Sequence, residues 1–249
     1  MKQLPLGVQL RATAVYASFA AGGNEELLAA LRNDDSMPVW LWGGHGFGKT
    51  HLLQAVCAAA GGAVAYVPLG GAAVSSAARH SAAAFPPEAL AGFEACRVVC
   101  LDDVDAVAGD AAWEEALFRL FNAAADARSR LIFAAQAPPS TPPWHLEDWR
   151  SRAASCVVYQ LRPLDESGIV LALRLRAAQR GLELPPETAD YLLRRLPRDV
   201  TTLLAILDRL DEASLVAQRR LTIPFIRDAL ETLAETAPAR KTSRTPASG

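Results

Sequence analysis

The sequence predicts an α/β protein in which a five-stranded parallel sheet flanked by helices is followed by a small all-α domain. A glycine-rich segment, residues 43–50 (GGHGFGKT), stands between a short apolar run and a helical pattern. Further apolar runs alternate with helical patterns as far as residue 161, and beyond Pro163 only helical patterns follow. Short buried strands that alternate with helices are typical of a parallel sheet with helices on its faces.

The glycine-rich segment fits the phosphate-binding pattern G-x-x-x-x-G-K-[ST]. Glycines let consecutive backbone N–H groups turn inward around phosphates, and the helix that follows adds its positive end. Lys49 would lie along the β- and γ-phosphates, and the Thr50 hydroxyl would bind Mg²⁺. The residues of this segment expected to contact a nucleotide are Gly43, Gly44, Gly46, Gly48, Lys49, Thr50 and His51.

A glycine-rich turn that binds nothing is the alternative interpretation of this segment. Its lysine argues against that alternative, because the chain has 25 basic residues and only Lys2, Lys49 and Lys241 are lysines. A compact ammonium suits phosphates, whereas the rest of the chain uses arginine. We therefore expect ADP or ATP, together with Mg²⁺, as the cofactors.

The composition is that of a globular chain and excludes several classes of function. The chain has 249 residues, of which 51% are hydrophobic, and a net charge of −2, which does not favour broad nucleic-acid binding. No apolar run approaches the roughly 18 residues of a membrane span, and the N-terminus lacks a signal-peptide pattern. We expect a soluble cytoplasmic protein without metal-ligand spacing, whose cysteines are buried free thiols: Cys57, Cys96, Cys100 and Cys156.

Hydrophobic periodicity places the individual elements along the chain. Strands are expected at 38–42, 63–69, 97–103, 130–136 and 156–161. Helices are expected at 51–60, 87–93 and 111–127, and from Asn24, as a side-chain cap, to Arg32. Residues 70–86 read as loop with partial helix, and 146–152 as a short exposed polar segment. The helical patterns beyond Pro163 cover 165–180, with Asp165 as cap and Gly181 as stop, then 186–196, 199–218 and 224–230.

Polar residues end two of the buried strands, at the edge where ligands bind to parallel sheets. Asp102 is placed to hold Mg²⁺ through water, and Asp103 to orient or deprotonate an attacking water. Gln136 either reaches the γ-phosphate or its water, or merely ends its strand. Asp105 is expected to be a solvated loop residue.

The first ten residues, MKQLPLGVQL, begin no regular element. From the residues alone, this terminus is either loosely packed or a peptide that docks elsewhere through leucine side chains. The tail from Ala237 lacks core-forming residues and is expected to be disordered.

The order of these features resembles the AAA+ ATPases, and within them the DnaA-related family. GGHGFGKTHLL resembles the initiator DnaA, and the sequence of other stretches is more similar to the Hda family of DnaA regulatory inactivators. The stretches that carry this closer resemblance are QLPLGVQL, YVPL, CLDDVDAVAGDAAWEEALFRLFN, RGLELP and LDRLDEASLVAQRRLTIPFI. The implied architecture is an AAA+ P-loop module followed by a helical lid domain.

The resemblance implies two partner proteins, the sliding clamp and DnaA, and assigns residues of this chain to each. The terminal residues Gln3, Leu4, Pro5 and Leu6 resemble a peptide that binds the DNA polymerase III beta sliding clamp. Arg152 falls on the arginine finger, which a neighbouring subunit inserts into an ATP site in trans. The implied function is to stimulate hydrolysis of DnaA-bound ATP, which leaves inactive ADP-DnaA and prevents re-initiation. DNA would be contacted only indirectly, no membrane is involved, and self-association is possible on this view.

The chain departs from the family pattern at two positions that bear on its own catalysis. Thr201 stands where the lid arginine that senses nucleotide is expected, and Arg198, one helical turn earlier, is a candidate for that role. Gln136 stands where an acid is usual. We therefore expect weak ATPase activity from this chain or none. Two alternatives remain open, an AAA+ ATPase loader of helicase or clamp that uses its own ATP, and an adaptor that only bridges clamp and partner.

The expected domain organisation has four parts. Residues 1–10 form the clamp-binding peptide, 11–162 the nucleotide-binding α/β domain, 163–232 the helical lid domain, and 233–249 the disordered tail.

Overall fold

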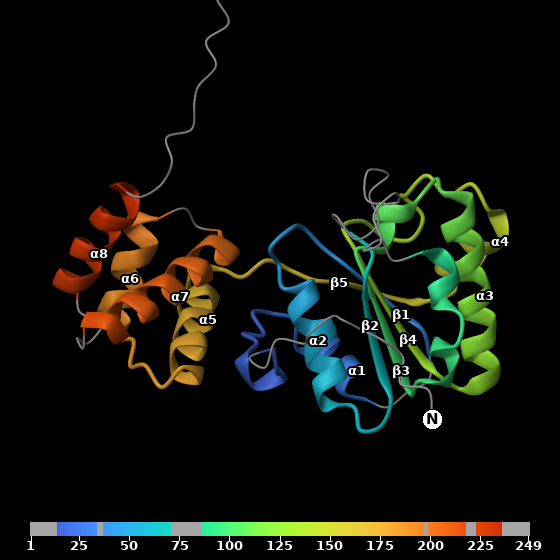
Figure 1. Ribbon diagram of the computed structural model, residues 1–249, viewed down its shortest axis with the longest axis horizontal. Helices are drawn as coiled ribbons and strands as arrows, with labels where there is room; N and C mark the ends of the chain where they lie inside the picture. The colour runs from blue at the N-terminus through green and yellow to red at the C-terminus, as the bar shows by residue number, and fades with distance from the viewer. Residues whose placement is uncertain (1–13, 34–36, 71–85, 197–198, 218–222, 236–249) are drawn as a thin grey trace, which may run out of the picture. The chain divides into compact units, whose positions relative to one another are not determined.

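The computed structural model describes residues 14–33, 37–70, 86–196, 199–217 and 223–235 (Figure 1). The chain divides into two compact units, one up to Leu175 and one from Arg176 onward. The expectations for residues 1–10, for 71–85, for Arg198 and for the tail beyond Glu235 therefore fall outside the described residues, whereas residues 233–235, expected in the disordered tail, are helical. No helix in the described ranges is long and apolar enough to cross a membrane.

The first unit is built on one parallel sheet. Its strands are β1 (Val39–Trp42), β2 (Val64–Pro68), β3 (Val98–Asp102), β4 (Arg130–Ala135) and β5 (Val157–Gln160). The strand order is β2-β3-β4-β1-β5, and every neighbouring pair is parallel. The register pairs Trp42 with both Ala135 and Gln160, and Pro68 with Asp102. As a result, the residues that follow β1, β3 and β4 meet at one edge of the sheet.

Helices cover both faces of this sheet (Figure 1). α1 (Glu25–Arg32) and α2 (Lys49–Ala59) lie on one face, and α3 (Ala111–Ala127) and α4 (Glu147–Ala154) on the other. Short 3-10 turns complete the unit: η1 (Tyr16–Ser18), η4 (Pro87–Leu90), η5 (Phe93–Ala95) and η6 (Val104–Val107).

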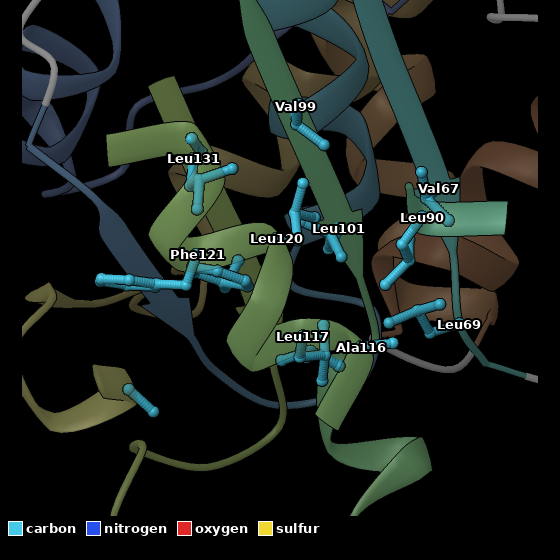
Figure 2. Close-up of a cluster of buried hydrophobic side chains, with 14 of the residues drawn as sticks. Val67, Leu69, Leu90, Val99, Leu101, Ala116, Leu117, Leu120, Phe121 and Leu131 are labelled. Carbon is cyan, nitrogen blue, oxygen red and sulfur yellow. The ribbon is translucent and has the colours of Figure 1, made fainter. Parts of the chain in front are cut away.

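Strand alternation divides the core into two apolar clusters. In β3, Val99 and Leu101 belong to the cluster under α3, and Val98 and Cys100 to the cluster under α2. Figure 2 shows Leu117, Leu120 and Phe121 of α3 lying over Val99, Leu101 and Leu131 of the sheet. Burying one such side chain stabilises the fold by about 1.5–3 kcal/mol.

The second unit begins inside α5 (Glu166–Gln179) and contains α6 (Pro186–Arg195), α7 (Val200–Ala217) and α8 (Ile223–Glu235). Leu203, Leu207 and Leu210 of α7 are buried, as the helical spacing predicts. Ion pairs join α5 to α7, with Arg176 Nη2 2.7 Å from Asp208 Oδ2 and Arg180 Nη1 2.6 Å from Asp211 Oδ2. Gly181 has φ 71°, a left-handed conformation that ends α5 there as predicted.

Several expected elements are confirmed closely. α3 has the predicted bounds, and the five strands fall within the predicted ranges. The Asp165 side chain accepts a hydrogen bond from the Gly168 N–H at 2.7 Å, which confirms its capping position. The four cysteines are free and buried, also as predicted.

Other expectations are wrong. The segment 146–152 is largely exposed, as expected, but residues 147–152 form part of α4, and its Trp149 is fully buried. The Asn24 side chain does not cap α1 but binds Arg162 after β5, accepting from its N–H at 2.8 Å. The helix expected at 87–93 is two 3-10 turns, η4 and η5. α8 extends to Glu235, beyond the predicted end at Leu230.

The aromatic cluster between α3, α4 and the sheet gives a prediction for stability. Phe133 is fully buried, with ring centroids 5.7 Å from Trp40 and 5.6 Å from Trp149. We expect Phe133→Ala to lower the free energy of unfolding by about 3–5 kcal/mol, because the cavity cannot collapse among rigid rings. Urea unfolding followed by tryptophan fluorescence measures this free energy of unfolding. Leu171→Ala, at a position that is 46% exposed, should change it by less than about 0.5 kcal/mol, and equal effects would contradict the packing account.

Candidate functional site

The glycine-rich loop joins the end of β1 to the start of α2. Gly48 has φ 101°, a conformation that favours glycine, and it directly precedes the first residue of α2, Lys49. A Cβ on Gly43 would lie 2.8 Å from the Leu161 carbonyl oxygen, so the loop packs closely against the residue after β5. This is the strand, loop and helix N-terminus that the sequence predicts, and it presents backbone N–H groups suited to an anion.

Lys49 is almost fully buried in this loop. Its side chain is 6% exposed, and Nζ donates to the carbonyl oxygens of Gly43 at 2.7 Å and Gly44 at 3.0 Å. Burial lowers the pKa of Lys49, while the nearby carboxylates of Asp103, Asp102 and Asp105 oppose that shift. The carboxylates thus favour an ammonium held inside the loop, where phosphate oxygens can replace the carbonyls as acceptors.

Asp102 is the centre of a buried hydrogen-bond network at the end of β3. Its side chain is 2% exposed, and Oδ2 accepts from Thr50 Oγ1 at 2.6 Å and from the Tyr66 hydroxyl at 2.8 Å. Oδ1 accepts from the Asp103 N–H at 3.1 Å. The structure therefore brings Thr50 and Asp102 into direct contact, as their assignment to one site requires.

The oxygen atoms of Thr50 and Asp102 fit a Mg²⁺ site of the kind found with nucleotides. Mg²⁺ uses one or two protein oxygens, with waters and phosphates supplying the other ligands. No group of three or more histidine, cysteine or acidic side chains in the described part of the chain could hold a metal by itself. Such a site would need the phosphates of the nucleotide to complete it.

Asp103 turns away from β3 in a left-handed conformation, with φ 53°. Burial and the neighbouring Asp102 carboxylate raise the pKa of Asp103, while Lys49 acts in the opposite direction. A Cβ on Gly70 would lie 2.5 Å from Asp103 Oδ2, so the glycine makes room for this carboxylate. A carboxylate with a raised pKa next to a phosphate loop has the chemistry of a base toward water.

Asp105 is not the solvated loop residue that the sequence suggested. Its Oδ2 accepts from the Gln136 N–H at 3.0 Å, and its Oδ1 is buried. This bond joins η6 to the end of β4 and fixes the backbone of Gln136, whose side chain remains exposed. Gln136 thus lies at the same edge of the sheet as the glycine-rich loop, since Ala135 pairs with Trp42.

The His51 side chain links α2 to the segment before α1. Its Nε2 lies 3.1 Å from both the Ser18 Oγ and the Val15 carbonyl oxygen. Its ring centroid is 5.6 Å from that of Phe19. The imidazole therefore holds residues 15–19 beside the start of α2, a role that the sequence did not suggest.

Arg152 lies on a different part of the unit. α4 returns the chain toward the amino edge of the sheet, where Val157 pairs with Val39 at the start of β1. Arg152 is exposed, and its guanidinium carbon lies 5.8 Å from the centroid of the Phe121 ring. Within the described residues it forms no ion pair, whereas Arg150 of the same helix pairs with Glu147 at 3.2 Å. Thr201 in the lid is also exposed.

Comparison with known families agrees with this geometry. The sequence model described as the bacterial DnaA ATPase domain matches residues 18–159, more than half of the chain. The chain belongs to this family. A second model, described as the Hda lid domain, matches residues 165–230, so the chain is a DnaA-related AAA+ protein with a lid of the Hda type.

Solved structures show the same fold in other DnaA-related and AAA+ proteins. Domain III of the Thermotoga maritima replication initiation protein DnaA has a TM-score of 0.72 at 20% identity, over 90% of this chain and 98% of that one. AMPPCP-bound DnaA from Aquifex aeolicus has a TM-score of 0.65 at 20% identity, over 92% of this chain and 72% of that one. The Thermotoga maritima RuvB Holliday junction branch migration motor has a TM-score of 0.59 at 15% identity, over 84% of this chain and 66% of that one.

Three residues of this DnaA-related unit have roles that the sequence did not predict. Tyr66 binds Asp102, Asp105 binds the Gln136 backbone, and Glu114 is a fully buried carboxylate on α3. The four-residue match YVPL contained Tyr66 but carried no sign of its partner. An acid inside the apolar pattern of α3 was the available signal for Glu114.

The raised pKa of Asp103 predicts how stability depends on pH. Because the folded protein holds this proton more tightly than the unfolded chain, Asp103 reduces stability as pH rises above its ordinary pKa of 3.8. Asp103→Asn, which keeps the left-handed conformation accessible, should therefore raise the melting temperature at pH 7. Thermal melts at several pH values should show this gain disappearing below about pH 4. A lower melting temperature at pH 7 would contradict the assignment.

Proposed function

We propose that this chain is a regulator of chromosome replication initiation that stimulates hydrolysis of the ATP bound to DnaA. Arg152 acts in trans as the arginine finger at DnaA's nucleotide, and the N-terminal peptide tethers the protein to the sliding clamp. DnaA is left with ADP, in its inactive form. Membership of the DnaA-related family and the Hda-type lid support a role in replication initiation.

The single observation that carries the proposal is the position of Arg152. The side chain is exposed on a helix anchored by the buried Trp149, and no acid of the described residues neutralises it. α4 leads away from the carboxyl edge that bears the glycine-rich loop. An arginine so placed is available to another protein's nucleotide, where it can neutralise charge on the transferring phosphoryl group.

The chain's own loop serves to bind nucleotide on this account. Lys49 would interact with the β- and γ-phosphates, and Thr50 and Asp102 would hold Mg²⁺, which neutralises phosphate charge when bound. Their contacts to each other and to the loop carbonyls support this assignment. The nucleotide, ADP or ATP, would keep the sheet unit and the lid in an arrangement competent to bind DnaA.

Weak hydrolysis by this chain follows from its two departures from the family pattern. The Gln136 side chain carries no charge, and Thr201 cannot supply a guanidinium to the nucleotide. Asp103 is available to orient or deprotonate a water, but an arginine or acid that completes the reaction at the γ-phosphate is missing from these two positions. Slow turnover, or simple retention of ADP, is the expected behaviour.

The tether rests on the N-terminal residues Gln3, Leu4, Pro5 and Leu6. Leucine side chains in apolar pockets of the clamp and a glutamine at the rim would bind this extended peptide. The clamp would then concentrate the protein near DNA without direct DNA contact, which agrees with a net charge of −2.

The two alternatives make different predictions from this proposal. A loader of helicase or clamp would hydrolyse ATP rapidly on its own and would be indifferent to DnaA. An adaptor that only bridges clamp and partner would bind both and leave the hydrolysis rate of DnaA unchanged.

Arg152→Ala should abolish the stimulation of DnaA. We expect the rate of hydrolysis of DnaA-bound ATP, measured with clamp loaded on DNA, to fall by about 10³-fold or more if the finger alone supplies the effect. Arg150→Ala is the matched control, because Arg150 lies on the same exposed helix and its pair with Glu147 is a surface pair. That control should stay within about fivefold of the parent. Full stimulation by Arg152→Ala would refute the finger assignment.

Replacing both Leu4 and Leu6 by Ala should abolish clamp binding. Losing two buried leucine side chains should weaken the affinity by about 100-fold or more, which surface plasmon resonance on immobilised clamp measures. Leu10→Ala, outside the four residues of the docking peptide, should bind as the parent does. If the double variant binds the clamp with the affinity of the parent, the N-terminal peptide is not the clamp-binding segment.

A further inference from the structure

Glu114 carries a fully buried carboxylate on α3, and all three of its hydrogen-bond donors are backbone N–H groups. Oε1 accepts from Gly109 at 2.8 Å, and Oε2 accepts from His145 at 2.8 Å and Leu146 at 2.6 Å. A buried charge is costly unless it is well hydrogen-bonded, and these short bonds are of the charge-assisted kind. The position therefore has a specific reason to be acidic.

The donors come from two segments far apart in sequence. Gly109 precedes α3, while His145 and Leu146 directly precede α4, whose first position has no side-chain cap of its own. Glu114 thus ties the entry of α4 to the entry of α3. At the other end of the same connection, Asp105 holds the Gln136 N–H at 3.0 Å. Both ends of residues 136–146 are therefore fixed by acids that follow β3.

The rest of α4 is fixed by packing on the same helix α3. Trp149 and Ala153 are fully buried, and the Trp149 ring centroid lies 6.4 Å from that of Phe121. The Arg152 guanidinium also lies over the Phe121 ring. Packing sets the rotation of α4 about its axis, whereas Glu114 sets where the helix begins.

We propose that Glu114 is a positioning residue for Arg152: its carboxylate fixes the start of α4 and so the place at which the guanidinium is presented to a partner's nucleotide. This inference rests on the proposed function of Arg152 as a finger. A misplacement of about 1 Å at such a residue can cost about 100-fold in rate, so a fixed helix start has a direct chemical consequence.

Glutamine cannot replace this carboxylate, although it has the same shape. Both oxygens of Glu114 accept, one from Gly109 and the other from the pair before α4. A glutamine has one acceptor oxygen, and its NH₂ group would face backbone N–H donors on the other side. Either orientation leaves buried donors without an acceptor and loosens one of the two segments.

The test compares Glu114→Gln with Glu115→Gln, the same change at the adjacent exposed residue. Glu115 pairs with Arg119 at 2.7 Å on the surface of α3, with 61% of its side chain exposed. Amide hydrogen exchange of residues 145–152 reads the start of α4 directly. Exchange there should be about tenfold faster or more in Glu114→Gln and unchanged in Glu115→Gln.

Stimulation of DnaA is measured on the same proteins. With Glu114→Gln, the maximal rate at saturating concentration should fall by about tenfold or more, because the finger is misplaced, while the half-saturating concentration changes by less than about threefold. Nucleotide affinity should remain that of the parent. Where the glutamine variant fails to fold, Glu114→Asp, which keeps the charge but is one methylene shorter, replaces it with the same expectations.

The outcomes separate this inference from the proposed function. Unchanged exchange at 145–152 in Glu114→Gln overturns the inference. So does faster exchange with an unchanged maximal rate when Arg152→Ala abolishes stimulation. If Arg152→Ala leaves stimulation intact, the proposed function is wrong, and so is the inference that Glu114 positions an arginine finger. The hydrogen-exchange result would still show whether Glu114 fixes the start of α4.

Discussion

The parallel pairing of all five strands is the constraint from which the site follows. All strands run in the same direction, so their carboxyl ends lie at one edge of the sheet. Each connection must therefore return the chain to the opposite, amino edge. Gly43, Asp102 and Gln136 meet at the carboxyl edge for this reason, since they end or follow β1, β3 and β4.

The same constraint separates the glycine-rich loop from Arg152. α4 lies on the return from β4 to β5, and its last turn leads to the amino edge, where β5 begins opposite the start of β1. A residue late in such a connection is poorly placed to serve the loop of its own chain. It is well placed to face a neighbouring molecule, which agrees with catalysis in trans.

Three acids organise the backbone around the site. Asp102 accepts hydrogen bonds from the Thr50 and Tyr66 hydroxyls. Asp105 accepts from the backbone at the end of β4, and Glu114 from the backbone at the start of α4. All three follow in sequence within one segment, from β3 to the first turn of α3. That segment therefore joins the edge that bears the glycine-rich loop to the helix that carries Arg152.

The parts that could be predicted from sequence are those governed by local patterns. The glycine-rich loop fits a fixed spacing, the apolar run before Asp102 is continuous, and α3 has a regular apolar stripe. Strand order and the acid contacts depend on long-range pairing, which no local pattern contains. Asn24 reaches Arg162 across 138 positions, so its side chain was unavailable as a helix cap.

α4 escaped prediction because its sequence is strongly polar. One tryptophan and one alanine, Trp149 and Ala153, supply its fully buried contacts, which is too few to make a periodic signal. The carboxylate of Glu114 supports its start from outside the segment. Tertiary packing, rather than local propensity, makes this helix.

The central claim is that this chain contributes an arginine to hydrolysis of a nucleotide held by another protein. The most direct measurement loads DnaA with ATP labelled at the γ-phosphate and this chain with unlabelled ADP, then follows release of labelled phosphate in a single turnover with clamp on DNA. The account predicts rapid release although this chain holds no ATP. No acceleration over DnaA alone, whether this chain carries ADP or unlabelled ATP, would contradict it.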